Sequence, residues 1–416
     1  MRIELLTVGT ELLLGFTIDT NAAEVARSLA SIGVEVVRRT SVGDDLTAIQ
    51  DAVGAAIDRT GAVLVTGGLG PTRDDVTKHA VSRLLDMPLE FHDEIWQQLV
   101  ERFRSLGREP AASNRSQAEV PRGGTVLRNR WGTAPGLWLE SPRGLVIMLP
   151  GVPIEMRNLL NQEVMPRLAP RAGNLVVRSR TVRTTAIPES TLAERLGDIE
   201  AAVHPLGLAY LPGLEGVDLR LTSWGTDAAT SDARLEAAAA EVRRRAGENV
   251  YGEDEDTLAA IVVAQLRKQG LTIGVAESCT GGLLGGRLTD VPGSSEAFRG
   301  GIIAYDNSVK VGQLGVPEAL LVAHGAVSEP VAQAMAEGVR LRLKVDLGVA
   351  ITGVAGPGGG TPEKPVGTVW LSVAGLGDIY SRRTIFLGSR PEIRARAVQT
   401  ALFMVHQRLL CRSGSS

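Results

Sequence analysis

Two patterns of apolar residues alternate over roughly the first 166 residues. Short runs rich in Val, Ile and Leu are typical of buried strands, whereas apolar residues at every third or fourth position predict helices. In chain order we predict strand 3–8, helix 20–32, strand 34–41, helix 46–59, strand 62–66, helix 74–85 and strand 144–149. Strands that alternate with helices and are apolar on both faces indicate a parallel sheet with helices on both sides.

The pattern changes between about residues 167 and 251. A strand with alternating charge is predicted at 174–185, and Pro188 and Glu189 then open a helix, because proline suits the first helical turn. The other predicted elements are strands at 208–211 and 217–223 and an alanine-rich helix at 228–246. This segment therefore predicts a small α+β domain.

The rest of the chain again alternates helices and strands. The predicted elements are a helix from residue 257, a strand at 271–276, a Gly-rich turn with a helix and a strand after it, a helix at 330–343, strands at 347–352, 368–374 and near Thr384, and a helix at 391–409. We therefore predict two α/β domains with mostly parallel sheets, at 1–168 and 253–412, joined by a small α+β domain at 169–252.

Composition narrows the classes of function. A chain of 416 residues is too long for one core, and 44% hydrophobic with 22% charged residues is typical of a soluble globular protein. The net charge of −3 gives no general attraction to nucleic acid or to an anionic membrane. Two cysteines, no membrane-length apolar run and no signal-peptide pattern lead us to expect a cytoplasmic protein without a membrane partner.

A candidate nucleophile follows the apolar strand at 271–276. Ser278 lies at the strand end, beside a helix N-terminus whose free N–H groups favour negative charge, which suits a nucleophile with an oxyanion site. Lys310 is the candidate base if burial lowers its pKa, and Tyr305 would relay or hold the proton. Alternatively, Ser278 or Thr280 only caps the helix, and the lysine is a solvated charge.

Three other features lie near this serine in the predicted domain. Cys279 is a rival nucleophile, because a thiolate at a helix N-terminus is activated. A Gly-rich loop follows Ile351, and its backbone N–H groups suit an anion, although a plain flexible loop has the same composition. Arg390 and Arg394 are four residues apart at the start of the last helix, where they form either a phosphate clamp or a solvated basic face.

The segments 276–282, 305–310, 352–357 and 364–368 together resemble the C-terminal domain of CinA proteins, which are nicotinamide-nucleotide amidases. The resemblance implies hydrolysis of nicotinamide mononucleotide to nicotinate mononucleotide and ammonia, with Ser278 as nucleophile, Lys310 as base and Tyr305 as an assisting hydroxyl. The resemblance implies no metal at this site. The candidate substrate contacts are Thr280, Gly281, Thr352, Gly353, Gly356, Arg390 and Arg394.

A second candidate site follows the strand at 62–66. The glycines after this strand suit a diphosphate, and Asp74 and Asp75 either hold Mg²⁺ or only cap the next helix. The segments 9–15, 19–21, 114–117, 129–136 and 150–156 resemble the molybdopterin-binding-like domain of CinA proteins. The residues singled out by this likeness are Gly67, Gly68, Gly70, Thr72 and Asn114 for the nucleotide, and Glu11, Asp74 and Asp75 for a divalent metal.

This second resemblance implies a nucleotide diphosphate ligand and, in some members, a metal-dependent ADP-ribose pyrophosphatase. Position 10 is Thr, where many relatives of this fold carry Asp, so one possible metal ligand is missing. The middle segment resembles the family's KH-like domain, but Glu215 and Asp218 near its Gly213–Gly216 loop would repel phosphate. We therefore interpret this domain as a spacer or interface, and nucleic acid is not an expected partner.

The combined prediction is a homodimeric, cytoplasmic enzyme with two separate sites for small-molecule nucleotides, which recycles fragments of pyridine nucleotides. The dimer is implied by the resemblance alone. One alternative is that the N-terminal domain only binds a nucleotide as a sensor. The other is a non-enzymatic adaptor for competence or DNA repair.

Overall fold

The computed structural model describes residues 1–173, 176–225 and 227–413. They form two compact units, residues 1–178 with 223–233, and residues 179–222 with those from 234 onward. The predicted strand at 174–185 begins on two residues, 174 and 175, that lie outside this description. The division into three domains stays a prediction.

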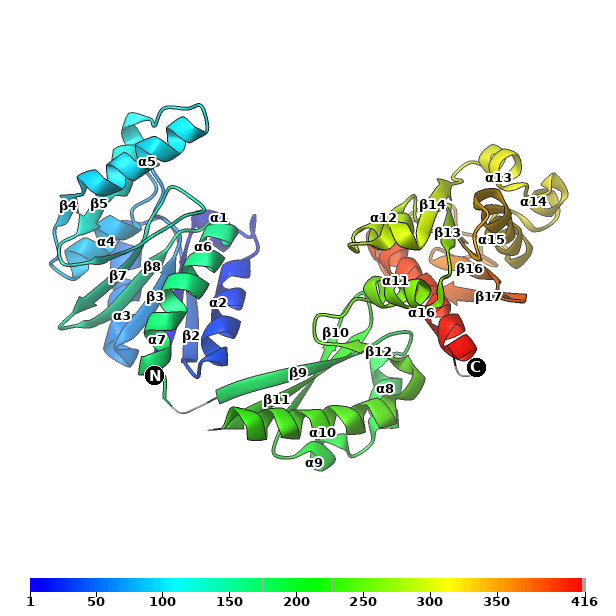
Figure 1. The fold of residues 1–416 in the computed structure, drawn as a ribbon, viewed down its shortest axis with the longest axis horizontal. Helices are drawn as coiled ribbons and strands as arrows, with labels where there is room; N and C mark the ends of the chain where they lie inside the picture. Colours follow the sequence, from blue (N-terminus) through cyan, green and yellow to red (C-terminus); the bar gives the residue numbers. More distant parts are fainter. Residues whose placement is uncertain (174–175, 226, 414–416) are drawn as a thin grey trace. The chain divides into compact units, whose positions relative to one another are not determined.

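The N-terminal part is a sheet between two helical layers (Figure 1). The neighbouring strands are, in order, β2 (Glu35–Val42), β1 (Arg2–Val8), β3 (Ala62–Thr66), β8 (Gly144–Leu149), β7 (Gly136–Ser141) and β6 (Thr125–Leu127). The first four run parallel, while β7 and β6 are antiparallel to their neighbours. The carboxyl ends of β1 and β3 therefore meet at one edge, where ligands bind in such sheets.

Alternate residues of β1 explain the two layers. Ile3 and Leu5 pack with α2 (Thr20–Ser31), α6 (Pro153–Leu159) and α7 (Met165–Leu168), whereas Leu6 and Val8 pack with α3 (Leu46–Thr60) and α4 (Thr77–Leu84). Successive side chains of a strand point to opposite faces, so one strand contributes to both cores. The other elements of this part are α1 (Thr10–Leu13), α5 (Asp93–Ser105), β4 (Leu89–Phe91) and β5 (Glu119–Pro121).

The predicted start of the helix at residue 74 is wrong. Helix α4 begins at Thr77, and its N-cap residue, Val76, makes no side-chain cap. Asp74 lies in the preceding turn, and the Asp75 carboxylate accepts hydrogen bonds from the N–H groups of Gly70 and Thr72, both at 2.8 Å. The acidic residues therefore organise a loop, since Asp side chains compete with the helix for backbone hydrogen bonds.

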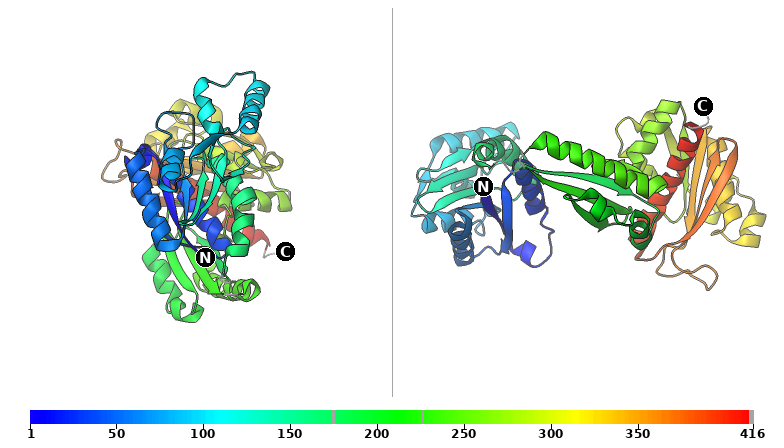
Figure 2. Two further views of the ribbon diagram at one scale, coloured as in Figure 1. Left: turned by 90° about the vertical axis from the view of Figure 1, so that its left-hand side faces the viewer. Right: turned by 90° about the horizontal axis from the view of Figure 1, so that it is seen from below.

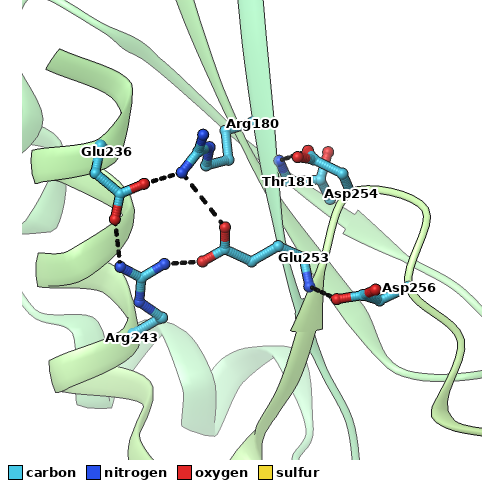
Figure 3. A network of polar contacts seen from close by, with 7 residues as sticks. All are labelled: Arg180, Thr181, Glu236, Arg243, Glu253, Asp254 and Asp256. Atoms are coloured by element: carbon cyan, nitrogen blue, oxygen red, sulfur yellow. Dashed lines mark hydrogen bonds and ion pairs between the residues drawn. The ribbon is translucent and has the colours of Figure 1, made fainter. Parts of the chain in front are cut away.

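The middle part is an antiparallel sheet with helices on one face (Figure 2). Its strands are β10 (Gly207–Pro212), β11 (Val217–Gly225), β9 (Val176–Thr184) and β12 (Val250–Glu253), and its helices are α8 (Glu189–Leu196), α9 (Ile199–Val203) and α10 (Ala228–Ala246). An ion-pair network joins α10 to β9 and β12 (Figure 3). Arg180 and Arg243 alternate in it with Glu236 and Glu253, so each guanidinium contacts two carboxylates.

The C-terminal part is again a sheet between two helical layers. Its strands are, in order, β14 (Phe298–Ile303), β13 (Ile273–Glu277), β15 (Leu347–Gly353), β16 (Thr368–Gly375) and β17 (Asp378–Ile385). Its helices are α11 (Leu258–Gln269), α12 (Leu283–Thr289) and α16 (Arg390–Ser413) on one face, and α13 (Asn307–Leu314), α14 (Glu318–His324) and α15 (Glu329–Leu343) on the other. Strands β14, β13 and β15 are parallel, and β16 and β17 are antiparallel.

The predicted α/β fold class is confirmed in both outer parts of the chain. In the C-terminal part the carboxyl ends of β13, β14 and β15 lie at one edge, and α16 runs along the sheet face beside β15 and β16 (Figure 2). None of the described helices combines the length and apolar character needed to cross a bilayer.

Candidate active site

Ser278 is held at the carboxyl end of β13. Its N–H donates to the carbonyl of Ile351 at 2.9 Å, which extends the pairing of β13 with β15 by one residue. The chain then turns through Gly281 and Gly282, with φ values of 58° and 99° that favour glycine. The strand end and this turn together fix the backbone of Ser278 at the edge of the sheet.

A buried carboxylate occupies the N-terminus of the next helix. Glu277 accepts hydrogen bonds from the N–H groups of Gly282 at 3.0 Å, Leu284 at 3.1 Å and Gly285 at 2.8 Å. The expectation that free N–H groups of this helix stabilise a developing negative charge is therefore wrong, because the chain's own glutamate already uses them.

Two other N–H groups of the same turn are available for an oxyanion. Gly281 donates to the carbonyl of Ser278 at 3.1 Å, and Leu283 donates to that of Thr280 at 3.3 Å. For the N–H groups of Cys279 and Thr280, the described part of the chain supplies no such acceptor. They belong to the first and second residues after Ser278, and the donors of an oxyanion site must lie close to the nucleophile.

Glu277 is expected to determine the stability of this turn. Its replacement by alanine should lower the free energy of unfolding around α12 by about 2–4 kcal/mol, because buried N–H donors lose their charged acceptor. Native-state hydrogen exchange of the α12 amides measures this change. Glu296→Ala is the matched control, since Glu296 forms an exposed ion pair with Arg267 and should cost under about 1 kcal/mol. Equal effects of the two variants would contradict a capping role for Glu277.

Lys310 is buried close to the strand that carries the serine. It lies on α13 with only 1% of its surface exposed, and its Nζ donates to the carbonyl of Tyr305 at 3.0 Å. The segment containing Tyr305 adjoins β13, because the N–H of Ala304 donates to the carbonyl of Glu277 at 2.7 Å. Burial lowers the pKa of Lys310, and the nearby Asp306 carboxylate opposes that shift only in part.

The present hydrogen bond of Lys310 is to a backbone carbonyl and not to the serine hydroxyl. Among the described residues, the Lys310 ammonium donates to a carbonyl, and no hydrogen bond joins it to Ser278 Oγ. Such contacts are often long without a substrate and shorten when one binds. Tyr305 is 62% exposed, and its hydroxyl accepts from Arg390 Nη2 at 3.1 Å, whereas its carbonyl accepts from Lys310 Nζ.

The environment of Cys279 disfavours it as the nucleophile. The thiol is only 6% exposed, and burial raises its pKa to about 11. The positive charges of Arg394 and Arg390 lower this pKa, but burial outweighs them. Cys279 therefore remains a thiol near neutral pH, where a cysteine nucleophile must be a thiolate.

The two candidate clamp arginines both reach the segments around Ser278. Arg390 donates to the carbonyl of Gly356 at 2.8 Å as well as contacting Tyr305, and Arg394 donates to the carbonyl of Thr280 at 2.7 Å. The start of α16 is capped by Glu392, whose carboxylate accepts from the N–H and hydroxyl of Ser389. An anion here would meet the guanidinium groups of Arg390 and Arg394.

The remaining C-terminal candidates differ in what they offer a ligand. The hydroxyl hydrogen of Thr352 is already bonded within the fold, since it is donated to the carbonyl of Ala326 at 2.9 Å. Thr280 is buried, and its Oγ1 has no hydrogen-bond partner among the described residues. Gly353 and Gly356 lie on the stretch that leaves β15. The structure thus brings Tyr305, Thr280, Gly356 and the two arginines together, while their roles stay predictions.

The N-terminal candidates surround a cavity of about 390 Å³. It is lined by the glycine loop after β3 and by five carboxylate residues from four segments. The lining includes Gly67, Gly68, Gly70, Glu11, Asp44, Asp74, Asp75 and Glu155. A Cβ on Gly67, whose φ is 102°, would lie 2.3 Å from the carbonyl oxygen of Val8, so only glycine lets the two strand ends approach this closely.

Thr72 and Asn114 are not among the residues that line this cavity. The hydroxyl and N–H of Thr72 both donate to Asp75. Asn114 donates to Gln117 Oε1 at 2.9 Å, and Gln117 in turn donates to Thr133 Oγ1 at 3.2 Å. Gln117 and Thr133 are the residues of this chain of contacts that line the cavity. Direct contacts of Thr72 and Asn114 with a nucleotide stay predictions, and their present contacts position other residues.

Sequence analysis missed Glu155 as a site residue. It is half-buried on α6, its carboxylate accepts from Asn129 Nδ2 at 2.6 Å, and burial raises its pKa. Asn129 and Glu155 lie in two of the segments that carry the resemblance, 129–136 and 150–156. Buried amides and carboxylates are usually hydrogen-bonded, so the presence of both residues in these segments was the available sequence signal. Asp44 was missed because it follows β2 without any motif of its own.

The carboxylates do not form a ready metal cage. Within the described ranges, no three His, Cys, Asp or Glu side chains are grouped closely enough to hold an ion. Both oxygens of Asp75 already accept hydrogen bonds from the loop. Glu11 and Asp74 still line the cavity, which suits Mg²⁺, because this ion is usually held by one or two carboxylates together with phosphate oxygens of a ligand.

Three family models together match almost all of the chain. They are the CinA C-terminal domain at 255–409, the probable molybdopterin binding domain at 4–170 and the damage-inducible protein CinA KH domain at 179–252. A CinA-like protein of Gemmatimonas aurantiaca is 53% identical over 406 residues, which cover 97% of this chain and 95% of that relative. The chain belongs to the CinA family.

Other members and solved structures share this likeness. A CinA-like protein of Synechococcus sp. is 46% identical over 415 residues, which cover 99% of each chain. The crystal structure of competence/damage inducible protein CihA from Agrobacterium tumefaciens is 40% identical, with a TM-score of 0.36, and the match covers 37% of this chain and 93% of that one.

In this CinA chain the KH-like loop is occupied by contacts within its own compact unit. The N–H of Gly213 donates to the carbonyl of Gly216 at 2.8 Å, and Thr185 Oγ1 donates to the carbonyl of Glu215 at 2.6 Å. The Glu215 carboxylate lies 3.1 Å from Arg287, on the helix that follows Ser278. These contacts agree with an interface role, and the absence of a nucleic-acid partner stays a prediction.

Proposed function

We propose that the C-terminal domain is an amidase that hydrolyses nicotinamide mononucleotide to nicotinate mononucleotide and ammonia. Ser278 Oγ attacks the carboxamide carbon, and neutral Lys310 accepts the hydroxyl proton and then delivers it to the departing ammonia. The N–H groups of Cys279 and Thr280 stabilise the oxyanion. Water then cleaves the acyl-serine, which releases the carboxylate product and restores the hydroxyl.

The observation that carries this proposal is the burial of Lys310 beside the end of β13. A lysine in water is almost entirely protonated near neutral pH and cannot act as a base. Burial lowers the pKa of Lys310, and the amine lies one hydrogen bond from the segment that adjoins the serine strand. A pKa lowered by burial at the edge of an α/β sheet is typical of a catalytic lysine.

The two arginines supply a feature needed for a nucleotide. Arg394 contacts the serine turn at Thr280, and Arg390 contacts the stretch after β15 at Gly356. Guanidinium groups bind phosphate through paired hydrogen bonds, so they suit the 5′-phosphate of the substrate. The direct test is ammonia release from nicotinamide mononucleotide by the purified chain and by its Ser278→Ala variant.

A second activity is favoured by the cavity of the N-terminal domain. We infer that it takes ADP-ribose together with a divalent cation, because a glycine loop and several carboxylates face one space of about 390 Å³. Glu11 and Asp74 would hold the cation, which when bound would neutralise the charge of the diphosphate. Glu155, whose pKa is raised by burial, suits the role of a base that takes a proton from the attacking water.

Asp74→Ala is expected to lower magnesium-dependent cleavage of ADP-ribose by about 100-fold or more. The release of AMP measures this cleavage with and without chelator. Asp51→Ala, which changes an exposed acid on α3, serves as the control and should have no effect.

If the wild-type chain binds ADP-ribose without cleaving it, the domain is a sensor. Salt-dependent DNA binding that survives Ser278→Ala, without ammonia release by the wild type, would instead favour the adaptor hypothesis.

A further inference from the structure

A cavity of about 540 Å³ lies between β17 and α16 on one side and the tip of the β10–β11 hairpin on the other. Its volume is typical of sites for small molecules. Every residue that lines it belongs to the same compact unit. The lining contains neither Ser278 nor Lys310, and none of the glycine-loop residues of the N-terminal domain. The cavity is therefore separate from both sites described above.

Three residues on the β17–α16 side of the cavity carry buried hydrogen-bond atoms without partners in the described part of the chain. Arg396 Nε, Gln399 Nε2 and Thr384 Oγ1 are buried, and none of them has a hydrogen-bond partner among the described residues. Gln399 is only 7% exposed. Buried polar atoms are nearly always paired, because an unpaired donor loses its hydration without compensation. Unpaired donors on three lining residues of one side are suited to a ligand with oxygen acceptors.

The charge of this wall points to an anion. Arg382 and Arg396 both line the cavity, and the described part of the chain places no carboxylate in ion-pair contact with either. Arg180 and Arg243, in the middle part of the chain, each contact two carboxylates (Figure 3). Glu215 also lines the cavity, but Arg287 pairs with its charge. Glu392, one turn before Arg396 on α16, interacts with its charge without a close ion pair. Guanidinium groups that form no close ion pair are suited to a phosphate or carboxylate.

The remaining lining is mostly apolar. The hairpin side and the end of β17 contribute aliphatic, proline and aromatic side chains. They are Ile187, Pro188, Pro212, Leu214, Ile385, Phe386 and Leu387. Glu189 is the other acidic lining residue, and it is exposed at the start of α8. A ligand that satisfies both walls carries an oxyanion at one end and a ring with apolar faces at the other.

We propose that this cavity is a third ligand site, which binds a mononucleotide. Arg382, Arg396 and Gln399 hold its phosphate, and its base lies against Phe386 and Leu214. The site is independent of both proposed activities, because it shares no lining residue with either candidate active site.

Equilibrium dialysis of the full chain with radiolabelled AMP tests this assignment. The Arg382→Gln/Arg396→Gln variant is expected to lose one AMP-binding component, with its Kd raised about 10-fold or more. Arg342→Gln removes an exposed arginine on α15 and should leave the isotherm unchanged. Binding of AMP by the N-terminal cavity does not interfere, because none of these substitutions touches that cavity and its contribution is the same in every variant.

Two further measurements complete the test. Gln399→Leu keeps both arginine charges and a similar side-chain volume, and it should weaken the same AMP-binding component. It therefore tests the site even if the double variant folds poorly. Adenosine and inorganic phosphate should each compete more weakly than AMP, because each fills only one end of the site. An AMP isotherm that is the same in the wild type and in both variants, or phosphate that competes as well as AMP, would overturn the assignment.

Discussion

Ser278→Ala is expected to reduce ammonia release from nicotinamide mononucleotide by about 10³- to 10⁶-fold, the range lost when other enzymes lose a nucleophilic serine. The variant lacks only the attacking oxygen. The turn should persist, because the Ser278 backbone contact with Ile351 and the Glu277 cap do not involve the hydroxyl. Binding of the substrate should therefore survive, so the loss should appear in kcat and not in KM.

Cys279→Ala is the matched control for this experiment. It changes the adjacent residue of the same turn and removes a thiol whose pKa burial raises to about 11. We expect its kcat to stay within about tenfold of the wild type, since alanine leaves only a small cavity. A cysteine variant that is inactive beside an active serine variant would reverse the assignment of the nucleophile.

The second large effect is expected at Lys310. Lys310→Met keeps the length of the side chain but removes the base, so kcat should fall by about 10²- to 10⁴-fold. Lys310→Arg should be similarly inactive, because arginine does not give up its proton. The methionine variant should also be at least as stable as the wild type near neutral pH, since it replaces a buried amine that is costly to charge.

The pH dependence supplies a separate readout for this lysine. Its pKa in the folded chain lies below the ordinary value of 10.5, so kcat/KM should rise with pH and level off before that value. The stability linkage has the same sign. Below the folded pKa the buried ammonium destabilises the fold, and this cost disappears as pH rises from the folded pKa toward the unfolded one. The stability gap between wild type and Lys310→Met should therefore close at high pH. A flat wild-type activity profile would contradict a lysine base.

Much of the fold follows from local pattern. The strand at 62–66 and the helix at 228–246 have the predicted bounds, because an unbroken apolar run and a long alanine-rich stretch each have one favourable structure. The start of α4 differs because Asp75 bonds to the loop before it. Helices α13 and α14 are short, and their sequence pattern is too weak to distinguish them from loops.

The candidate sites were predictable only as sets of residues. Motif spacing placed Ser278, Lys310 and the arginines in one domain, but it did not show that Glu277 caps α12. A glutamate before a serine has the same sequence whether it faces water or a helix N-terminus. Glu155 was not predicted for a similar reason, since burial raises its pKa and its partner Asn129 lies 26 residues away in sequence.

By itself, the sequence determined the alternation of strands and helices, the loops that end at the sheet edges and the chemical types of residue available there. These depend on periodicity and local backbone preference, which neighbouring residues carry. Tertiary structure alone decided that Lys310 is buried, that Cys279 stays protonated, that Glu277 accepts from the N-terminus of α12, and that Arg382 and Arg396 form no close ion pair with a carboxylate among the described residues. Burial and charge pairing depend on segments distant in sequence, so they exist only once the chain has folded.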